Sequence, residues 1–594
     1  MYFLSDRHFR SAVGSPWGPR QPDPYFEKST QVYALALRKG EVPTFLPAHE
    51  LDKDSDKKKE DKEDNEEDKK EKEVQVEIDF EGIQNRLFLA PVGNGHFRNL
   101  SVSKKHLFWQ EDGMSTHPDR LLKAWEIKRD AETVTLVEKV SGYRLSSDRK
   151  KLLVKKGDNL YVIDAKGAKP KKLAEAKVDL SKWRLRIDPT EEWRQMLVDA
   201  WRMHRDWFYD KNMHGVDWKG ELERHLPLVD RVKDRDELNE VIGHFVGELS
   251  ALHTSINAGD VRRGDDRINP AKLGARLRRA DSRGGYEVEH IYRSDPDYRE
   301  RLSPLARPEV GVSEGDVIVS VNGISTLSVP DIAVQLKEEA GGQVLLGVKT
   351  EDARRDVIVY PISGRRESSL RYEDWEYSRR LAVEKASDGA IGYVHLRAMG
   401  RNDIAQWVRE YPPVFDRKGL IVDVRHNNGG NIDSWILGKL LRKAWFYWQR
   451  RVGKPYWNMQ QAFRGHLVVL VDERTASDGE AFAEGFRRLG LGPVIGKRTW
   501  GGEIWLSGST WLVDRGRARS PESGVYGPER EWLIEGHGVE PDQVVDNLPH
   551  ATFNGKDAQL DAAIAYLKKM IEEDPREVPP PPPYPNKAFD YEKE

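Results

Sequence analysis

"HLVVLVDERTASDGEAFAEGF", residues 466–486, runs from an apolar stretch through a polar turn into an amphipathic stretch. The first part is apolar and short, as expected of a buried strand. The last part repeats apolar residues at the spacing of one helix face, with Phe482, Phe486 and Leu489 on it, and Gly490 is placed to end the helix. The sequence therefore predicts a strand–turn–helix unit of an α/β layer.

Ser477 lies in the turn of this unit, where two roles are open. A serine directly before a helix is an ordinary N-cap. The same position exposes a hydroxyl at the end of a strand, where the N–H groups of the helix start could stabilise an oxyanion. Because a serine hydroxyl is too weakly acidic to attack by itself, the nucleophile interpretation requires a base elsewhere in the chain.

The surrounding residues 366–572 alternate apolar strands with helices, which predicts an α/β domain. In "KGLIVDVRHNNGGNIDSWILGKLL" (418–441), a strand leads through the glycine-rich turn 427–430 into a helix that begins near Asp433. Free backbone N–H groups in such a turn can hold an anion. No Lys-Ser/Thr pair follows, as a nucleotide-binding P-loop requires, so an oxyanion pocket is the favoured interpretation.

Residues 268–365 form a second, strand-rich unit that contains "GVSEGDVIVSVNGISTL" (311–327). Its glycine turn, alternating strand and Asn-Gly pair are followed by a helix expected from about Val329 and a closing strand. This pattern resembles a PDZ domain, which implies capture of an extended peptide by strand addition. The alternative is a small β-domain that only packs against its neighbours.

Residues 187–262 carry helical periodicity, which predicts a helical domain. The first helix is expected to be capped by Thr190, and the second to run through "RDELNEVIGHFVGELSALH" (235–253), with His253 in its last turn. Taken alone, His253 is a surface or packing histidine.

Residues 1–178 show alternating strands and a weak repeat of about 45 residues, which suits blades of a β-propeller. A small open sheet domain is the alternative. The strands are too few to close a ring, so an N-terminally truncated sequence is expected. The charged insertion 52–73 and the proline-rich tail 578–594 are predicted to be disordered.

Composition excludes several classes of function. Lysine plus arginine (96) nearly balances aspartate plus glutamate (99) over 594 residues, which argues against a nucleic-acid partner or an anionic membrane surface. Cysteine is absent, which excludes disulfides, thiolate catalysis and cysteine-ligated metals. Every apolar stretch is far shorter than the ~18 residues of a membrane-spanning helix, so no membrane partner is expected.

The order of "GELSALHTS" (247–255), the PDZ-like unit, "IVDVRHNNGG" (421–430), "ERTASDGEAFAEGF" (473–486) and "IEGHGVEPD" (534–542) resembles the C-terminal half of the tricorn proteases. These are relatives of the carboxy-terminal processing proteases. The resemblance implies a multidomain α+β and α/β fold with propeller blades, a helical domain, a PDZ-like domain and an α/β sandwich protease domain. It also implies a cytoplasmic serine endopeptidase that cleaves oligopeptides or unfolded segments, needs no metal or organic cofactor, and assembles into a homo-hexamer.

The resemblance also assigns a catalytic set. Ser477 would be the nucleophile, His253 its general base, and Glu535 the support of the proton relay. In the tricorn pattern a serine precedes the catalytic histidine and links it to the glutamate, whereas this chain has Leu252. Leucine can make no such bond, so Glu535 would have to reach the histidine directly, through water or through a neighbouring hydroxyl. A peptide-binding scaffold with a disabled relay is therefore an alternative function.

The same resemblance places the oxyanion hole and a specificity residue. Gly429, or its neighbour Gly430, would share the oxyanion hole with the backbone N–H of Asp478. The Asp478 side chain would favour a basic P1 residue in the substrate.

Two other bases are open. Processing proteases use a lysine in a "TxGKG"-like turn, and here "RTWGGE" (498–503) has Gly502 at the lysine position. A Ser–Lys dyad would need Lys497 to reach Ser477 from the preceding strand. His537 in "IEGHGVEPD" competes with His253, although its flanking glycines favour an ordinary turn residue. An imidazole with a pKa of about 6.5 suits proton transfer at neutral pH.

Overall fold

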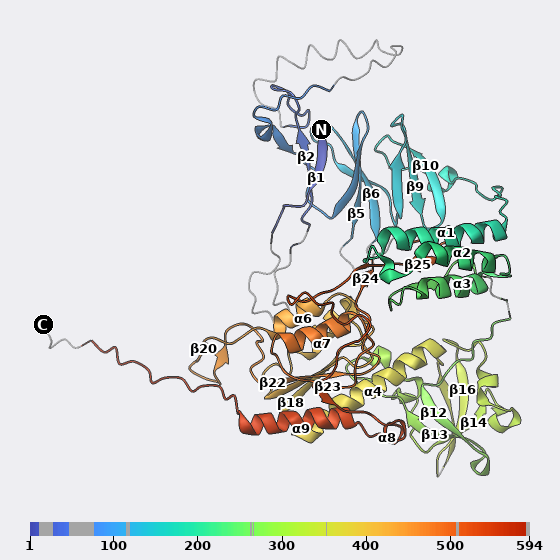
Figure 1. Ribbon diagram of the computed structural model, residues 1–594, viewed down its shortest axis with the longest axis vertical. Coiled ribbons are helices and arrows are strands. Elements are labelled where there is room, and N and C mark those ends of the chain that lie inside the picture. The colour runs from blue at the N-terminus through green and yellow to red at the C-terminus, as the bar shows by residue number, and fades with distance from the viewer. Residues whose placement is uncertain are drawn as a thin grey trace. The chain divides into compact units, whose positions relative to one another are not determined.

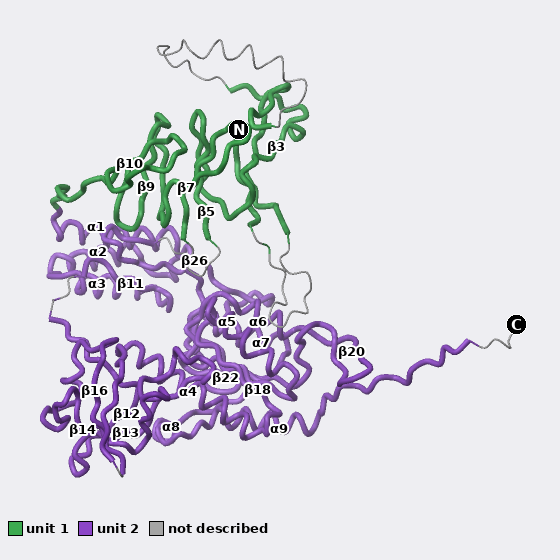
Figure 2. Tube along the Cα trace, turned by 180° about the vertical axis from the view of Figure 1, so that it is seen from behind, with its two compact units in different colours: residues 1–186 green, residues 187–594 purple. Residues whose placement is uncertain are grey.

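The computed structural model describes residues 1–10, 26, 28–46, 76–113, 119–261, 264, 266–351, 353–506 and 510–589. The chain divides into two compact units, Met1–Arg186 and Ile187–Glu594 (Figure 2). The charged insertion 52–73, predicted to be disordered, lies outside the described residues. Described residues beyond position 574 form neither helix nor strand.

The first unit consists of antiparallel sheets in which each strand pairs with its neighbour in sequence (Figure 1). The stretch "KLLVKKGDNLYVIDAKG" (151–167) forms a hairpin, because Gly157 adopts the positive φ of 57° that a two-residue turn requires. Within the described residues the sheets are open and hold three, four and three strands. They are β1 (Tyr2–Ser5), β2 (Gln31–Leu35) and β3 (Leu87–Leu89); β4 (Phe97–Val102), β5 (His106–Asp112), β6 (Arg120–Glu126) and β7 (Thr133–Val137); and β8 (Gly142–Leu145), β9 (Lys151–Lys156) and β10 (Asn159–Asp164).

The second unit begins with three helices, α1 (Pro189–Trp207), α2 (Trp218–Val229) and α3 (Arg235–Gly247), which bury a shared apolar core. Asp188, and not the predicted Thr190, caps α1, because its carboxylate accepts the first free N–H groups and Pro189 occupies the first helical position. The prediction that His253 lies in the last turn of α3 is wrong. The helix ends at Gly247, and Ser250 then adopts a φ of 50° that turns the chain away from the helix axis.

The strand-rich region forms one sheet in the order β12-β13-β14-β16-β17, with β15 paired to β14. The helix expected from about Val329 is only a 3₁₀ turn, Ile332–Leu336, because Pro330 lacks an N–H donor and Asp331 caps the turn that follows. The strands are β12 (Ala275–Ala280), β13 (Gly285–Ile291), β14 (Val317–Val321), β15 (Ile324–Ser325), β16 (Val344–Lys349) and β17 (Arg354–Val359).

The α/β region is built on a parallel five-stranded sheet with helices on both faces (Figure 1). Helices α4 (Gly364–Ser387) and α9 (Ala558–Glu573) bury one face, and α5 (Arg401–Glu410), α6 (Asp433–Leu440) and α7 (Asp478–Arg488) bury the other. The sheet order is β18 (Ile391–His395), β19 (Gly419–Asp423), β22 (His466–Val471), β23 (Val494–Gly496) and β27 (Gln543–Val544).

This sheet positions the two turns singled out in the sequence. Both the glycine-rich turn and the Ser477 turn follow the carboxyl ends of adjacent strands, β19 and β22, where ligands bind in open α/β sheets. The predicted start of α6 at Asp433 is confirmed, and α7 ends before Gly490, which has a φ of 68°. Shorter elements complete the unit: β11 (Ser255–Asn257) with β25 (Arg517–Arg519), β20 (Tyr447–Trp448) with β21 (Tyr456–Trp457), β24 (Trp505–Leu506) with β26 (Pro521–Ser523), and α8 (Pro549–Phe553).

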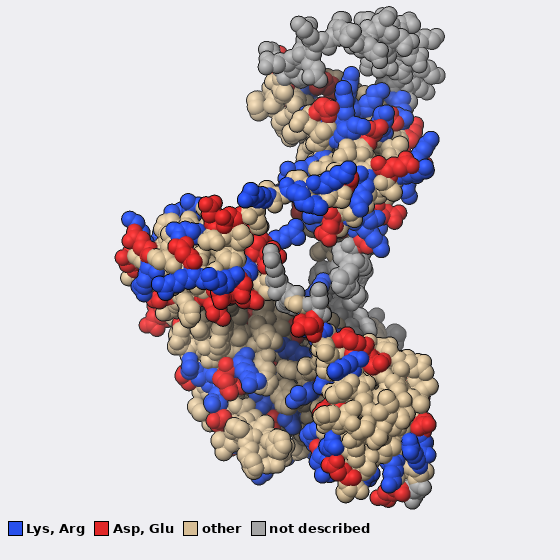
Figure 3. All heavy atoms as spheres, turned by 90° about the vertical axis from the view of Figure 1, so that its right-hand side faces the viewer, with Lys and Arg blue, Asp and Glu red and all other residues tan. Residues whose placement is uncertain are grey.

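None of the helices in the described ranges is both long enough and apolar enough to cross a membrane. Lysine and arginine side chains are intermingled with aspartate and glutamate side chains over the face shown in Figure 3. This distribution accords with the near balance of charge in the sequence.

Candidate active site

Ser477 occupies a strained turn between β22 and α7, with φ 55° and ψ −129°. Such angles are rare for a residue with a side chain and persist only where the surroundings hold them. The Ser477 N–H donates to the Glu480 carboxylate at 2.9 Å, and the neighbouring Ala476 N–H donates to the Asn427 carbonyl at 2.9 Å. In the described structure the Ser477 hydroxyl makes no hydrogen bond to α7, because the Glu480 N–H donates to the Ser477 carbonyl at 2.7 Å instead. The side chain is therefore free of the ordinary role of an N-cap.

Glu480 is a residue of this site that the sequence analysis missed. Its carboxylate is fully buried and accepts hydrogen bonds from the N–H groups of Ser477, Gly501 and Gly502 and from the Thr499 hydroxyl. Burial raises the pKa of Glu480, and these donors oppose the shift. The sequence signal that could have identified Glu480 is an acidic residue three positions after a serine at the start of a helix. Glu480 thus fastens the turn 499–502 to the Ser477 turn.

The glycine-rich turn lies directly against Ser477. A Cβ atom added to Gly429 would lie 2.5 Å from the Ser477 Cβ, so only glycine fits there. The Gly429 N–H, however, already donates to the Asn427 Oδ1 at 2.8 Å. Gly430 is exposed, and neither its N–H nor that of Asp478 donates to an acceptor in the described part of the chain. Of the two glycines, Gly430 is the one with a free donor.

Gly430 is held in place by pairing with a loop after β18. The Met399 N–H donates to the Gly429 carbonyl, and the Asn431 N–H donates to the Met399 carbonyl, both at 2.8 Å. The Asn428 N–H donates to the Arg397 carbonyl at 3.0 Å. The orientation of the Gly430 N–H therefore depends on the loop 397–400.

His253 lies in the loop between α3 and β11, and the pairing of β11 with β25 brings it to the α/β region. The His253 ring meets the Trp500 ring edge-on, with 5.3 Å between the centroids. The backbone N–H of Trp500 in turn donates to the carbonyl of Thr475, two residues before Ser477. Among the described residues no hydrogen bond joins the imidazole to the Ser477 hydroxyl, and the buried Nδ1 has no partner. Catalytic hydrogen bonds often tighten only when substrate binds.

Glu535 reaches the segment that carries His253. Its carboxylate accepts the Leu252 N–H at 2.9 Å and the Glu503 N–H at 2.8 Å. The backbone of Leu252 thus makes a bond to Glu535 that its side chain cannot make. Burial lowers the pKa of His253, and the Glu535 charge opposes part of that change.

Comparison with known proteins places the chain in a family. Residues 390–545 match the family model of peptidase family S41, residues 189–247 that of the tricorn protease C1 domain, and residues 271–364 that of the tricorn protease PDZ domain. The chain belongs to the tricorn branch of peptidase family S41. The resemblance inferred from the order of the motifs is confirmed.

Curated relatives agree with this tricorn assignment. Tricorn protease homolog 1 of Streptomyces coelicolor is 32% identical over 528 residues, which cover 85% of this chain and 48% of the relative. A putative tricorn-like protease C-terminal subunit of Sulfurisphaera tokodaii is 32% identical over 510 residues, which cover 84% of this chain and 58% of the relative. The chain spans about half the length of the curated relatives it matches. A crystal structure of the tricorn protease matches with a TM-score of 0.83 at 24% identity over 96% of this chain and 54% of that chain, which shows the same fold.

In this tricorn-family chain the Asp478 carboxylate caps α6. It is 1% exposed, and its Oδ2 accepts the N–H groups of Ile432 at 2.7 Å and Asp433 at 3.2 Å. Burial raises the pKa of Asp478 to about 7. The carboxylate therefore faces the start of α6, while the Asp478 N–H donates to no acceptor in the described structure.

The two competing bases have other partners. The Lys497 ammonium pairs with Asp546 at 3.3 Å. In the part of the chain that the structure describes, the hydrogen bonds of the His537 ring stay within its own turn, to the Glu535 carbonyl at 3.1 Å and the Ile534 N–H at 3.2 Å. Neither makes a hydrogen bond to Ser477 in the described ranges.

Metal-binding side chains gather elsewhere in the unit. Glu221, His225 and Glu248 present ligand atoms within 4.8 Å of one another at α2 and the end of α3. Arg224 already pairs with Glu221 and lies 3.9 Å from Glu248, so the negative charge is partly neutralised without an ion. This group belongs to no step at Ser477.

Proposed function

We propose that this chain is the catalytic part of a serine endopeptidase that cleaves oligopeptides or unfolded polypeptide segments through an acyl-enzyme. The observation that carries the proposal is the Ser477 turn. Within the described residues the Ser477 hydroxyl does not cap α7, and the neighbouring N–H groups of Gly430 and Asp478 donate to no acceptor. Membership of an S41 peptidase family supports the same reaction.

In the proposed mechanism the Ser477 oxygen attacks the scissile carbonyl while His253 takes the hydroxyl proton. The Gly430 and Asp478 N–H groups stabilise the oxyanion of the tetrahedral intermediate. His253 then returns the proton to the leaving amine, and a water molecule activated by the same imidazole hydrolyses the acyl-enzyme. The Glu535 charge stabilises the imidazolium and, through the Leu252 N–H, orients the loop that carries His253.

Labelling with a fluorophosphonate tests this proposal, because only an activated serine reacts. We expect one labelled site, lost in Ser477→Ala and retained in the control Ser368→Ala, which removes an exposed hydroxyl on α4. His253→Ala is expected to suppress labelling as well, and Lys497→Ala is expected to leave it intact because that ammonium pairs with Asp546. The opposite result for these two variants would establish a Ser–Lys dyad.

The second candidate function is a peptide-binding scaffold without catalysis. The unpartnered His253 Nδ1 favours it, because an imidazole without an acceptor holds its tautomer poorly. Folded wild-type protein that stays unlabelled, yet binds an extended peptide, would support the scaffold.

Finer features of the proposal remain predictions. A preference for lysine or arginine at P1 through Asp478 requires its carboxylate to leave the start of α6, so a leucine reporter cleaved as fast as a lysine reporter would end that prediction. Cytoplasmic location and assembly into a hexamer come from family resemblance alone. The propeller-blade interpretation of residues 1–178 comes from that resemblance and from the weak repeat of about 45 residues.

A further inference from the structure

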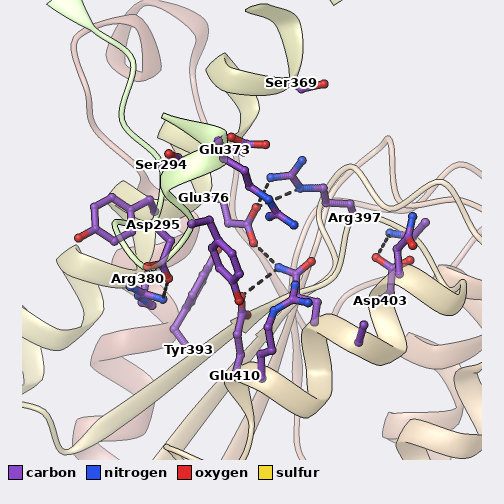
Figure 4. A pocket seen from close by; sticks show the side chains of 18 of the residues that line it. Ser294, Asp295, Ser369, Glu373, Glu376, Arg380, Tyr393, Arg397, Asp403 and Glu410 are labelled. Carbon is purple, nitrogen blue, oxygen red and sulfur yellow. Dashed lines mark hydrogen bonds and ion pairs between the residues drawn. The ribbon is translucent and has the colours of Figure 1, made fainter. Parts of the chain in front are cut away.

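A cavity of about 540 Å³ lies between the segment 294–301, helix α4 and the segment 397–410 (Figure 4). Its lining includes five arginines and five carboxyl groups. Figure 4 shows the Glu376 carboxylate joined to the Arg397 guanidinium within it. None of Ser477, His253, Gly430 and Glu535 lines it, so it is separate from the candidate active site.

Three of the arginines are neutralised by carboxylates of the same lining. Each is joined to its partner by a short ion pair, and two of the pairs are doubly hydrogen-bonded. The pairs are Arg366 with Glu373 at 2.8 Å, Arg380 with Asp295 at 2.8 Å, and Arg397 with Glu376 at 2.6 Å. These pairs form a rigid, charge-balanced frame around the cavity.

The other two arginines, Arg301 and Arg409, have no carboxylate partner among the described residues. Their guanidinium carbons lie 4.5 Å and 5.2 Å from the centroid of the Tyr298 ring. In the described structure the Nε of Arg409 is buried and donates to no acceptor. Leaving a buried cationic donor without an acceptor costs free energy, and a bound anion would remove that cost.

Ser294 adds an independent sign of a missing partner. Its side chain lines the cavity and is 5% exposed, and its hydroxyl has no hydrogen-bond partner in the described structure. Buried hydroxyl groups are almost always hydrogen-bonded. Both the Ser294 hydroxyl and the Arg409 Nε can donate to oxygen atoms of a ligand that enters the cavity.

The charge of the lining favours an anion. Burial and the nearby Glu376 raise the pKa of Glu410 to about 8, which reduces the negative charge of the lining at neutral pH. The Asp403 carboxylate accepts the N–H groups of Ala398 and Gly400, both at 3.1 Å. The other three carboxylates are committed to ion pairs with arginines, so within the described residues no carboxylate of the lining pairs with Arg301 or Arg409.

We propose that this cavity binds the carboxylate of a small organic acid or short peptide, held by Arg301, Arg409 and the Ser294 hydroxyl. Arginine pairs with a carboxylate in a planar, two-pronged geometry. Tyr298 and Tyr377 also line the cavity, and their rings pack against the guanidinium groups of Arg301, Arg409 and Arg380. A volume of about 540 Å³ lies within the range of small-molecule pockets.

Isothermal titration of the full chain with N-acetylglycylglycine and with benzoate tests the proposal. The matched probe is N-acetylglycylglycine amide, which lacks the charge. We expect at least one acid to bind saturably and the amide not to bind. The Ser477→Ala protein should bind the same acid equally well, which separates this site from the proposed catalysis.

Three cavity variants and one control locate the binding. Arg301→Gln and Arg409→Gln should each weaken binding about tenfold or more, because each removes a charge-assisted hydrogen bond. Ser294→Ala, the mildest change, should weaken it severalfold, and Arg307→Gln, an exposed arginine outside the lining, should have no effect. Thermal melts of each variant verify folding. Equal affinity in all variants, equal binding of acid and amide, or no binding of either acid overturns the proposal.

Discussion

Replacing Glu480 by glutamine tests whether the buried carboxylate shapes the Ser477 turn. One carboxylate oxygen accepts the N–H groups of Ser477 and Gly502, and the other accepts the Gly501 N–H and the Thr499 hydroxyl. A glutamine keeps the volume and retains one acceptor oxygen. Its NH₂ group must then face donors at the other position.

The magnitude follows from the number of donors left without an acceptor. Two of the four hydrogen bonds are lost, at least one of the orphaned donors is a buried N–H, and each such loss costs about 1–3 kcal/mol. We expect Glu480→Gln to lose roughly 3 kcal/mol of stability in the α/β region. A shift of the Ser477 turn by about 1 Å lowers turnover roughly 100-fold.

The assay combines urea denaturation with turnover of a peptide reporter. Glu484→Gln is the matched control, because Glu484 lies one turn further along α7 and pairs with Arg487 and Arg488, whose side chains are partly exposed. A glutamine can still accept from these arginines, so the change should cost about 1 kcal/mol, less than Glu480→Gln. If Glu480→Gln matched Glu484→Gln in both stability and turnover, the positioning role of Glu480 would be refuted.

Three further predictions concern the same site. Because burial lowers the pKa of His253, the acid limb of the pH profile of turnover should have its midpoint below the ordinary imidazole value of about 6.5. Glu535→Gln removes a charge that raises this pKa, so it should move the midpoint to still lower pH and reduce turnover. An upward shift contradicts the assigned roles. Gly429→Ala should abolish fluorophosphonate labelling, since its Cβ would lie 2.5 Å from the Ser477 Cβ; unchanged labelling would contradict the contact. Asp403→Asn should lower kcat more than it changes KM, because the Asp403 carboxylate holds the loop 397–400 that pairs with the glycine-rich turn. The control is Asp416→Asn, at an exposed residue. An effect on KM alone would contradict the coupling of this loop to the oxyanion hole.

Local sequence was sufficient where the structure depends on nearest neighbours along the chain. The strand and helix around Ser477, the glycine-rich turn and the start of α6 follow from apolar spacing and from glycine placement. The end of α3 was mispredicted because the apolar spacing continues to Leu249, whereas a left-handed Ser250 redirects the chain. Helix ends depend on such single backbone angles, which residue type alone does not fix.

By itself the sequence determined the α/β layer, the order of its motifs and the serine at the strand end, because hydrophobic period and turn chemistry are local properties. The tertiary structure alone decided which donors are free and which groups meet. The Asn427 Oδ1 accepts the Gly429 N–H, whereas the Gly430 N–H donates to no acceptor in the described residues. The Glu535 carboxylate accepts the Leu252 N–H, although 283 positions of sequence separate the two residues. These contacts depend on how distant backbone segments pack, and the pattern of residue types along the chain does not record that packing.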